Sequence, residues 1–343
     1  MSGPLPITIG GAFSSPYTMK MRAVLRYRRL PFRWVLRNSR WDDLPDVPVK
    51  IIPVLAFPDD EGRLVEAMVD SSPQIDRLEA DYPGRHLTPP NGALAFIDRL
   101  IEDFADEWVT KLMYHYRWTY EPDIEKAGRL LPLDQNMQAD DDALDRMHDY
   151  IIDRQIRRRA MVGSTDGNQP ILEASYHRLL DLLQRHLGAN DFLLGDRPGR
   201  GDFALYGQLK PMLWWDPSPM AIAVERAPRA LHWIERVDDL SWWEVDGDAG
   251  WTAPDQLPPT VHEFLGEIGR TYAPFMVANA AALAAGDDEV TCVIDGADYR
   301  QAPFKYQGKC LVWLRAAHDA LDGTERTIVA DLLAGTGCEP LVA

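Results

Sequence analysis

The period of the hydrophobic pattern changes once along the chain, and this change limits the folds that the chain can adopt. In residues 1–86, alternating segments typical of strands are interleaved with segments of helical spacing, in the order strand, helix, strand, hairpin, helix. From about residue 93 to residue 243 the spacing is helical almost throughout. Large apolar residues recur there every four positions: Phe96, Leu100, Phe104, Trp108 and Leu112. The sequence therefore predicts an α/β domain followed by an all-α domain.

Two stretches rich in turn-forming residues divide the chain. Residues 83–92 combine Pro, Gly, His and Asn, and residues 246–259 are acidic and rich in proline. We therefore expect three parts: residues 1–86, residues 92–250 and a C-terminal extension over residues 251–343. Within the extension the pattern predicts helices over 261–283, 309–321 and 326–333, and strands or irregular segments over 289–294 and 299–306.

Charge and cysteine content exclude several classes of protein. The net charge of −17 disfavours nucleic acid or an anionic membrane as a partner, because both require a basic surface. The longest weakly polar run, residues 274–286, is shorter than the roughly 20 residues that span a bilayer. No signal peptide is evident. Three widely spaced cysteines form neither a disulfide framework nor a zinc site, so we expect a cytoplasmic protein without a metal.

The first candidate functional residues lie at the junction between the first predicted strand and the first predicted helix. Pro16 suits the first position of a helix and Ser15 suits its N-cap. The N-terminus of a helix carries partial positive charge, so a hydroxyl group there can donate to a bound anion such as a thiolate and lower its pKa. The alternative is that Ser15 only caps the helix.

Two further candidate positions follow in the same region of the sequence. Pro53 enters a strand, either at an edge or bulge or through a cis peptide bond, which would leave the backbone of Ile52 free to pair with an extended peptide. Asp70 and Ser71 stand where a strand ends and a helix begins. A carboxylate beside a helix N-terminus can hold an amino group and a carboxylate together, although this pair too could be a simple cap.

Taken in this order, these segments resemble the glutathione transferase superfamily. SSPYTMKMR, IIPVL and VDSSPQIDRLE occupy the places of the family's active-site loop, cis-proline and acidic-serine pair. FLLGDRPGRGDFALYGQL resembles the N-capping box of a later helix, with Asp202 as its buried aspartate and Gly199 where Ser or Thr is usual. The resemblance covers residues 5–245. It implies a thioredoxin-like domain followed by a helical domain, with the extension as an addition.

The resemblance also implies a set of site residues. Ser15, or else Ser14, would face the sulfur of glutathione, which is the implied co-substrate. Ile52, beside cis-Pro53, would pair with the cysteinyl part, and Asp70 and Ser71 would hold the γ-glutamyl end. The residues implied for the pocket of a hydrophobic electrophile are Phe13, Tyr17, Trp108, Leu112, Tyr116 and Trp214. For Trp108 and Leu112 the alternative is membership of the buried helical stripe.

The function implied by the resemblance is that of a glutathione S-transferase in detoxification, acting as a homodimer. No cysteine lies near the active-site loop in the sequence, which disfavours a mixed disulfide with the protein's own thiol. One alternative is a specialised glutathione-dependent lyase, isomerase or dehalogenase. Another is a binding or assembly protein of the same fold that has no turnover.

Overall fold

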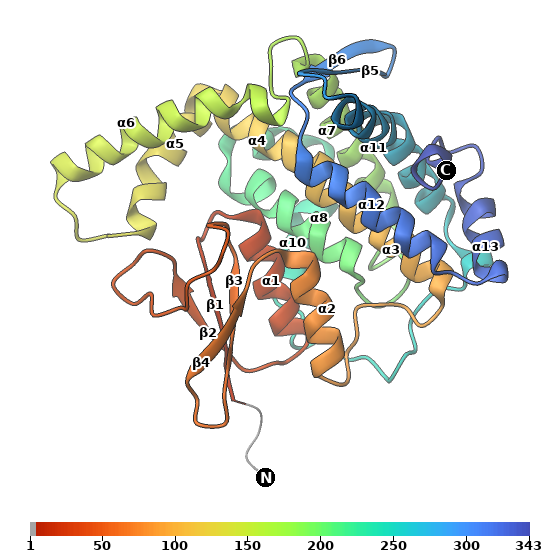
Figure 1. Cartoon of the computed structure of the whole chain (residues 1–343), viewed down its shortest axis with the longest axis horizontal. Helices are drawn as coiled ribbons and strands as arrows, with labels where there is room; N and C mark the ends of the chain where they lie inside the picture. Colours follow the sequence, from red (N-terminus) through yellow and green to blue (C-terminus); the bar gives the residue numbers. More distant parts are fainter. Residues whose placement is uncertain (1–4) are drawn as a thin grey trace.

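The N-terminal part contains a four-stranded sheet with helices on one side. A computed structural model describes residues 5–343 (Figure 1). The strands lie in the order β2-β1-β3-β4, with β1 parallel to β2 and antiparallel to β3. The elements are β1 (Ile7–Gly11), α1 (Pro16–Tyr27), β2 (Phe32–Leu36), β3 (Val54–Pro58), β4 (Leu64–Met68) and α2 (Ser71–Asp81). The predicted order of strands and helices is confirmed, and so is the thioredoxin-like fold.

The hydrophobic pattern explains how these elements pack. Every residue of β1 is buried, as expected for a central strand, and α1 turns Met21, Val24 and Leu25 onto the sheet. Pro16 begins α1, and Ser15 caps it by accepting a hydrogen bond from the Thr18 amide at 3.3 Å. The Ile52–Pro53 peptide bond is cis, which is the second of the two alternatives that the sequence left open for Pro53.

The second part is helical, as predicted. Its helices are α3 (Gly92–Phe104), α4 (Thr110–Thr119), α5 (Glu121–Leu130), α6 (Asp141–Arg158), α7 (Gln169–His186), α8 (Arg200–Lys210), α9 (Pro217–Arg226) and α10 (Pro228–Asp238). One π-helical turn, η1 (Ala105–Val109), joins α3 to α4, so that the predicted apolar stripe runs along one continuous buried helix. Helix α8 packs against both α1 and α3 and thereby connects the sheet to the helical part.

The C-terminal extension folds back onto the rest of the molecule. It consists of α11 (Pro259–Ala285), the hairpin β5 (Val290–Ile294) and β6 (Ala297–Gln301), α12 (Lys305–Asp319) and α13 (Gly323–Leu333). Helix α11 packs against α7, and α12 and α13 pack against α3. In Figure 1, α12 crosses in front of α3 and lies above α2. The three-part division of the chain at residues 86, 92 and 251 stays a prediction, although α12 and α13 share the core of the helical part.

No helix within residues 5–343 is both long enough and apolar enough to cross a bilayer.

The Asp202 half of the predicted capping box of α8 is present and fully buried, whereas Gly199 at the N-cap has no side chain to make the reciprocal bond. The Asp202 carboxylate accepts hydrogen bonds from the amides of Gly199, at 2.9 Å, and Leu193, at 3.0 Å. Burial raises the pKa of Asp202 to about 7, against the lowering effect of these two amides. Asp202 therefore connects the first turn of α8 to the segment that precedes it.

We expect Asp202→Ala to lower the free energy of unfolding by at least about 2 kcal/mol, because two buried amides lose their acceptor and each such loss costs roughly 1–3 kcal/mol. Urea unfolding of this variant beside Asp248→Ala, at an exposed aspartate, is the measurement. Equal stability of the two variants would contradict the role assigned to Asp202.

Candidate ligand site

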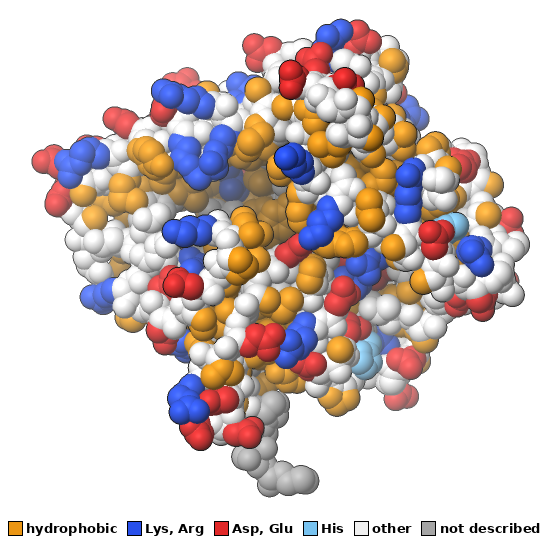
Figure 2. All heavy atoms as spheres, in the orientation of Figure 1, with side chains coloured by type: hydrophobic (Ala, Val, Ile, Leu, Met, Phe, Trp, Pro, Cys, Tyr) orange, Lys and Arg blue, Asp and Glu red, His pale blue; other side chains and the backbone are white. Residues whose placement is uncertain are grey.

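A cavity of about 460 Å³ lies where the sheet domain, the helical part and the extension meet. Figure 2 shows the molecule hollowed between α6, α12 and the sheet domain, with a largely hydrophobic floor and Lys and Arg side chains on the rim. The walls come from the first turn of α1, the start of α2, the continuous helix α3-η1-α4 and one face of α12. The cavity is large enough for a ligand of peptide size.

Four of the site residues implied by the resemblance line this cavity. They are Tyr17 in α1, Ile52 before the cis-proline, and Asp70 and Ser71 at the start of α2. These positions are separated by up to 54 residues in the sequence, and the fold brings them to one wall. The three segments that carried the resemblance therefore converge on a single space.

Ser14, Ser15 and Pro53, which the resemblance also implied for the site, are not among the cavity-lining residues. Ser15 is half-buried at the cap of α1, and Ser14 is buried with its carbonyl oxygen accepting a hydrogen bond from Arg117 at 3.1 Å. The Pro53 carbonyl oxygen accepts a hydrogen bond from Gln74 at 2.9 Å. No residue of the loop that carries the serines lines the cavity, whereas the helix that follows it contributes Tyr17.

The remaining residues implied for an electrophile pocket also lie away from the cavity. Trp108 is fully buried and donates from Nε1 to Ser175 at 3.0 Å, and Leu112 is buried beside it, as the alternative reading expected. Tyr116 stacks on Tyr120. The other two lie at the surface: Phe13 is 49% exposed and Trp214 is 57% exposed.

Helix α12 supplies the wall that sequence reasoning missed. Its side of the cavity consists of Phe304, Tyr306, Gln307, Cys310, Trp313 and Leu314. Tyr306, Cys310, Trp313 and Leu314 follow one another at intervals of four, three and one residues, which places them on one face of a helix. That spacing indicates a buried face, but a single sequence does not show which element the face packs against.

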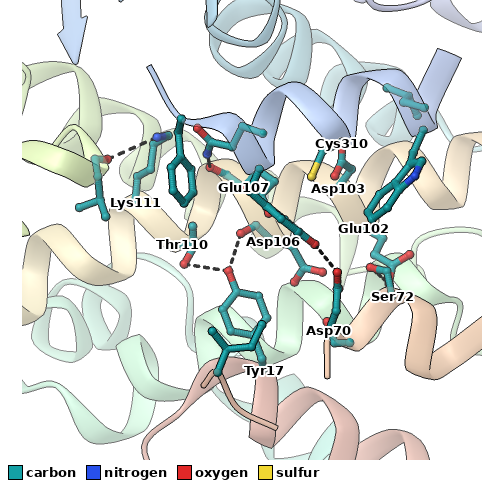
Figure 3. Close-up of a pocket in the computed structure, with 18 of the residues that line it drawn as sticks. Tyr17, Asp70, Ser72, Glu102, Asp103, Asp106, Glu107, Thr110, Lys111 and Cys310 are labelled. Carbon is teal, nitrogen blue, oxygen red and sulfur yellow. Dashed lines mark hydrogen bonds between the residues drawn. The ribbon is translucent and has the colours of Figure 1, made fainter. Parts of the chain in front are cut away.

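The extension makes a direct hydrogen bond to the expected glutathione site. The Tyr306 hydroxyl group donates to Asp70 Oδ2 at 2.7 Å, across 236 residues of sequence (Figure 3). Asp70 itself has φ of +80°, a backbone conformation that non-glycine residues rarely adopt and that recurs at ligand sites. An ionised carboxylate has several acceptor positions, so Asp70 can accept from Tyr306 and still bind a ligand.

A fully buried ammonium group stands behind the start of α2. Lys20 Nζ lies 2.8 Å from Glu102, 2.6 Å from Asp106 and 3.1 Å from the Ser71 hydroxyl oxygen. Glu102 also accepts from Arg200 Nε at 2.8 Å, and its pKa is lowered because Arg200 and Lys20 outweigh the effect of burial. Lys20 thus ties α1, α2 and the α3-η1 helix together in one network of ion pairs.

Three carboxyl groups follow one another along the helix that forms the cavity wall. Asp106 and Glu107 are buried and Asp103 is half-buried, and withdrawal from water raises the pKa of each, with repulsion from neighbouring carboxyl groups adding to the shift. For Asp103 the pKa is raised to about 7. Figure 3 shows their side chains along α3 and η1, opposite α12. This wall therefore holds carboxyl groups that are partly protonated near neutral pH.

Two further ionisable groups of the cavity have pKa values shifted toward their neutral forms. Tyr17 donates to the Asp106 carbonyl oxygen at 2.7 Å, and burial beside Glu107 and Asp106 raises its pKa well above the ordinary value. Burial lowers the pKa of Lys111 to about 7.

Cys310 lines the cavity although the sequence placed no cysteine near the active-site loop. Burial and the nearby carboxyl groups raise the pKa of its thiol, so it is a poor nucleophile at neutral pH. No group of three or more metal-ligating side chains occurs within residues 5–343.

The fold and the position of the cavity define a class of protein: a thioredoxin-like domain joined to a helical domain, with a ligand site between them. The model of the glutathione S-transferase N-terminal domain matches residues 11–86, and the model of the C-terminal domain matches residues 141–236. Together the two matches cover half of the chain. The chain belongs to the glutathione S-transferase superfamily.

Several solved structures are similar to this chain. A GST-like protein from Pseudomonas syringae is 15% identical, with 68% of this chain and 66% of that chain covered and a TM-score of 0.43. A glutathione transferase from Burkholderia graminis, with two glutathione molecules bound per subunit, is 16% identical, with coverages of 70% and 90% and a TM-score of 0.41. A family member from Pseudomonas fluorescens with two bound glutathiones is 14% identical, with coverages of 70% and 95% and a TM-score of 0.40. No curated protein matches the sequence.

We expect Lys20→Met to lower the free energy of unfolding at pH 7.5 by about 3–5 kcal/mol, because Glu102 and Asp106 lose their shared cation inside the protein. Removing the ammonium group raises the pKa of both carboxyl groups, because Lys20 lowers each of them, so acidification protonates them and removes part of the penalty. The loss should therefore be smaller at pH 5.5 than at pH 7.5.

Urea unfolding at the two pH values measures this difference, with Lys305→Met at an exposed position of α12 as the control. A loss in Lys20→Met that is small, or that grows on acidification, would show that the buried ammonium does not hold the two parts together.

Proposed function

We propose that this protein is a glutathione S-transferase that binds glutathione in the cavity and activates its thiol as a thiolate for attack on a hydrophobic electrophile. One observation carries the proposal: Tyr17, Ile52, Asp70 and Ser71 line one cavity, although they come from the three separate segments that resemble the family's glutathione site. Membership of the superfamily supports it independently.

The cavity suggests how the tripeptide lies. The backbone of Ile52 would pair with the cysteinyl residue, and Asp70 with the start of α2 would hold the γ-glutamyl amino and carboxylate groups. The sulfur would then point toward the N-terminus of α1, where Ser15 caps the helix. The Ser15 hydroxyl oxygen accepts from Thr18, so its proton is available to donate to a thiolate.

The chemistry requires little beyond this arrangement. The thiol loses its proton to solvent, and the thiolate forms a carbon–sulfur bond while the leaving group departs with its electron pair. A bound thiol whose pKa is two units below its usual value is stabilised as thiolate by about 2.7 kcal/mol. A specialised lyase, isomerase or dehalogenase would use the same thiolate on a different substrate.

Calorimetric titration with reduced glutathione, in two buffers of different ionisation enthalpy, tests binding and proton release together. Binding with close to one proton released near pH 7 supports the thiolate mechanism. Binding without proton release would argue against thiol activation, and absence of binding at millimolar glutathione would overturn the proposal. Conjugation of 1-chloro-2,4-dinitrobenzene is the accompanying activity assay.

We expect Ser15→Ala to raise the pKa of bound glutathione by one to two units, because a hydrogen bond to a charged group contributes about 1.5–3 kcal/mol. The ultraviolet absorbance of the thiolate, followed against pH in the complex, measures the pKa. Ser15→Thr, which keeps a hydroxyl group, is the matched control and should retain the low pKa. If Ser14→Ala shifts the pKa and Ser15→Ala does not, the hydroxyl group is supplied by Ser14.

A second candidate function rests on the hydrogen bond between Tyr306 and Asp70. A binding or assembly protein without turnover could keep its glutathione site covered by α12, since Tyr306 already engages the carboxylate that would hold the ligand's amino group. In the transferase, by contrast, Tyr306 orients this carboxylate for the ligand.

Tyr306→Phe separates the two functions. For the transferase we expect glutathione affinity to fall about tenfold, because Asp70 loses the hydrogen bond that fixes it. Tyr150→Phe, at an exposed position on α6, is the control and should leave affinity unchanged. Tighter binding in Tyr306→Phe would instead favour the binding protein whose site the extension covers.

We also propose that the protein acts in the cytoplasm as a homodimer. The basic run over residues 154–159 at the end of α6 supports a subunit contact, since α6 buries none of its residues in the part of the chain that the structure describes. Light scattering during size-exclusion chromatography measures the mass directly, and a monomer at micromolar concentration would contradict this assembly.

A further inference from the structure

We propose that the electrophilic substrate carries a positively charged ammonium group, which binds between Asp106, Glu107 and Gln307 where η1 faces α12. This inference rests on the proposed transferase function and names the class of its second substrate: an apolar chain or ring bearing a cationic nitrogen.

Two buried acceptors in this part of the cavity have no partner within residues 5–343. Asp106 Oδ1 accepts no hydrogen bond, although Oδ2 of the same carboxylate accepts from Lys20 at 2.6 Å. Gln307 Oε1 accepts none either, while its Nε2 donates to the Glu107 carbonyl oxygen at 3.2 Å. Asp106 is 6% exposed and Gln307 is 2% exposed, and both line the cavity. Buried acceptors left unpaired are costly, so a ligand with N–H donors suits them.

The carboxyl groups that line the cavity outnumber the basic side chains that line it. Asp103 accepts a hydrogen bond from Tyr272 and Asp70 accepts one from Tyr306, and both of these donors are neutral. The titratable and charged groups that line the cavity are Tyr17 from α1, Asp70 before α2, Arg99, Glu102 and Asp103 from α3, Asp106 and Glu107 from η1, Lys111 from α4, and Tyr306 and Cys310 from α12. A bound cation would allow Glu107 and Asp103 to ionise without mutual repulsion.

Lys20 and Lys111 are already committed to other partners, and the third basic side chain nearby, Arg99, lies 3.9 Å from Asp76. Lys20 bonds to Glu102, Asp106 and Ser71. Lys111 donates to Gln301 Oε1 at 2.8 Å and to the Val162 carbonyl oxygen at 3.3 Å, and it lies 4.2 Å from the centre of the Phe275 ring. An anionic substrate would therefore meet unpaired carboxyl groups without a free cation at η1.

Apolar side chains line much of the remaining cavity. Val49 and Ile51 approach from the sheet domain, Met161 from the segment after α6, and Phe304 and Trp313 from the extension. Aromatic faces also attract cations. Tyr17 bonds to η1 through the Asp106 carbonyl oxygen, so the first turn of α1, where the thiolate would lie, adjoins the proposed ammonium site.

The test compares three probes of equal length: hexylammonium, hexanol and hexanoate. Calorimetry with the full chain, without glutathione, measures the affinity of each. We expect hexylammonium to bind at least tenfold more tightly than hexanol, and hexanoate to bind most weakly. Hexylammonium should also release protons near pH 7, because the cation lowers the pKa of the carboxyl groups beside it, whereas hexanol should release none.

Two variants locate the site. Glu107→Gln keeps the shape of the side chain but removes the charge, and Gln307→Met removes the unpaired acceptor at similar volume. Each should reduce the preference for hexylammonium over hexanol about tenfold. Glu225→Gln, at an exposed position of α9, is the control and should leave the preference unchanged. Thermal unfolding beforehand shows which variants fold, and either variant alone suffices for the test.

Equal affinity for hexylammonium and hexanol, tighter binding of hexanoate, or an equal loss in the Glu225 control would overturn the inference. Glutathione is titrated separately in the same series. If glutathione binds with proton release and the probes show no preference, this inference fails and the transferase proposal stands. If hexylammonium is preferred and glutathione does not bind, the ammonium site stands and the transferase proposal fails.

Discussion

The buried Lys20 ammonium group is the interaction on which the arrangement of the site depends. It comes from α1, yet its three partners lie on α2 and on the α3-η1 helix, so it fixes the sheet domain against the helical part at the point where the cavity opens. Burying a charge without partners costs several kcal/mol, and replacing such a pair by apolar residues is often neutral. Stability alone therefore does not account for this network. Unlike an apolar contact, the ammonium group holds the Ser71 hydroxyl oxygen and the Asp106 carboxylate, which both line the ligand site, at fixed distances from one atom.

The π-helical turn η1 gives that wall its chemistry. A π turn inserts one residue into an α-helix and is found most often at functional sites. Here it lies within the apolar stripe, and Asp106 and Glu107 occupy it while Trp108 stays in the core. Acidic and apolar side chains are thus buried together within one turn of the helix. The repulsion among these carboxyl groups is tolerated because their raised pKa values keep part of them neutral.

Local sequence signals predict much of this fold but only part of the site. Ser15 and Pro16 specify the start of α1, and Asp202 specifies the start of α8, because capping depends on residues a few positions apart. Asp70 and Ile52 were found because they follow strand ends within recognisable segments. Lys20 was missed, since a lysine inside a helix gives no sign that its ammonium group will be buried. The wall formed by Tyr306 and Gln307 was missed for a related reason: their partners lie some 200 residues earlier, and helical spacing does not identify a partner.

The position of α12 in the chain has a consequence for the timing of folding. Ribosomes add about 5–20 residues per second, and N-terminal domains generally fold first. Both family domains are synthesised by about residue 240, whereas α12 begins at Lys305, so several seconds separate them. During that interval the wall that carries Asp70, Asp106 and Glu107 faces solvent. The cavity is completed only when α12 docks, so both preceding domains are synthesised before the wall that α12 supplies.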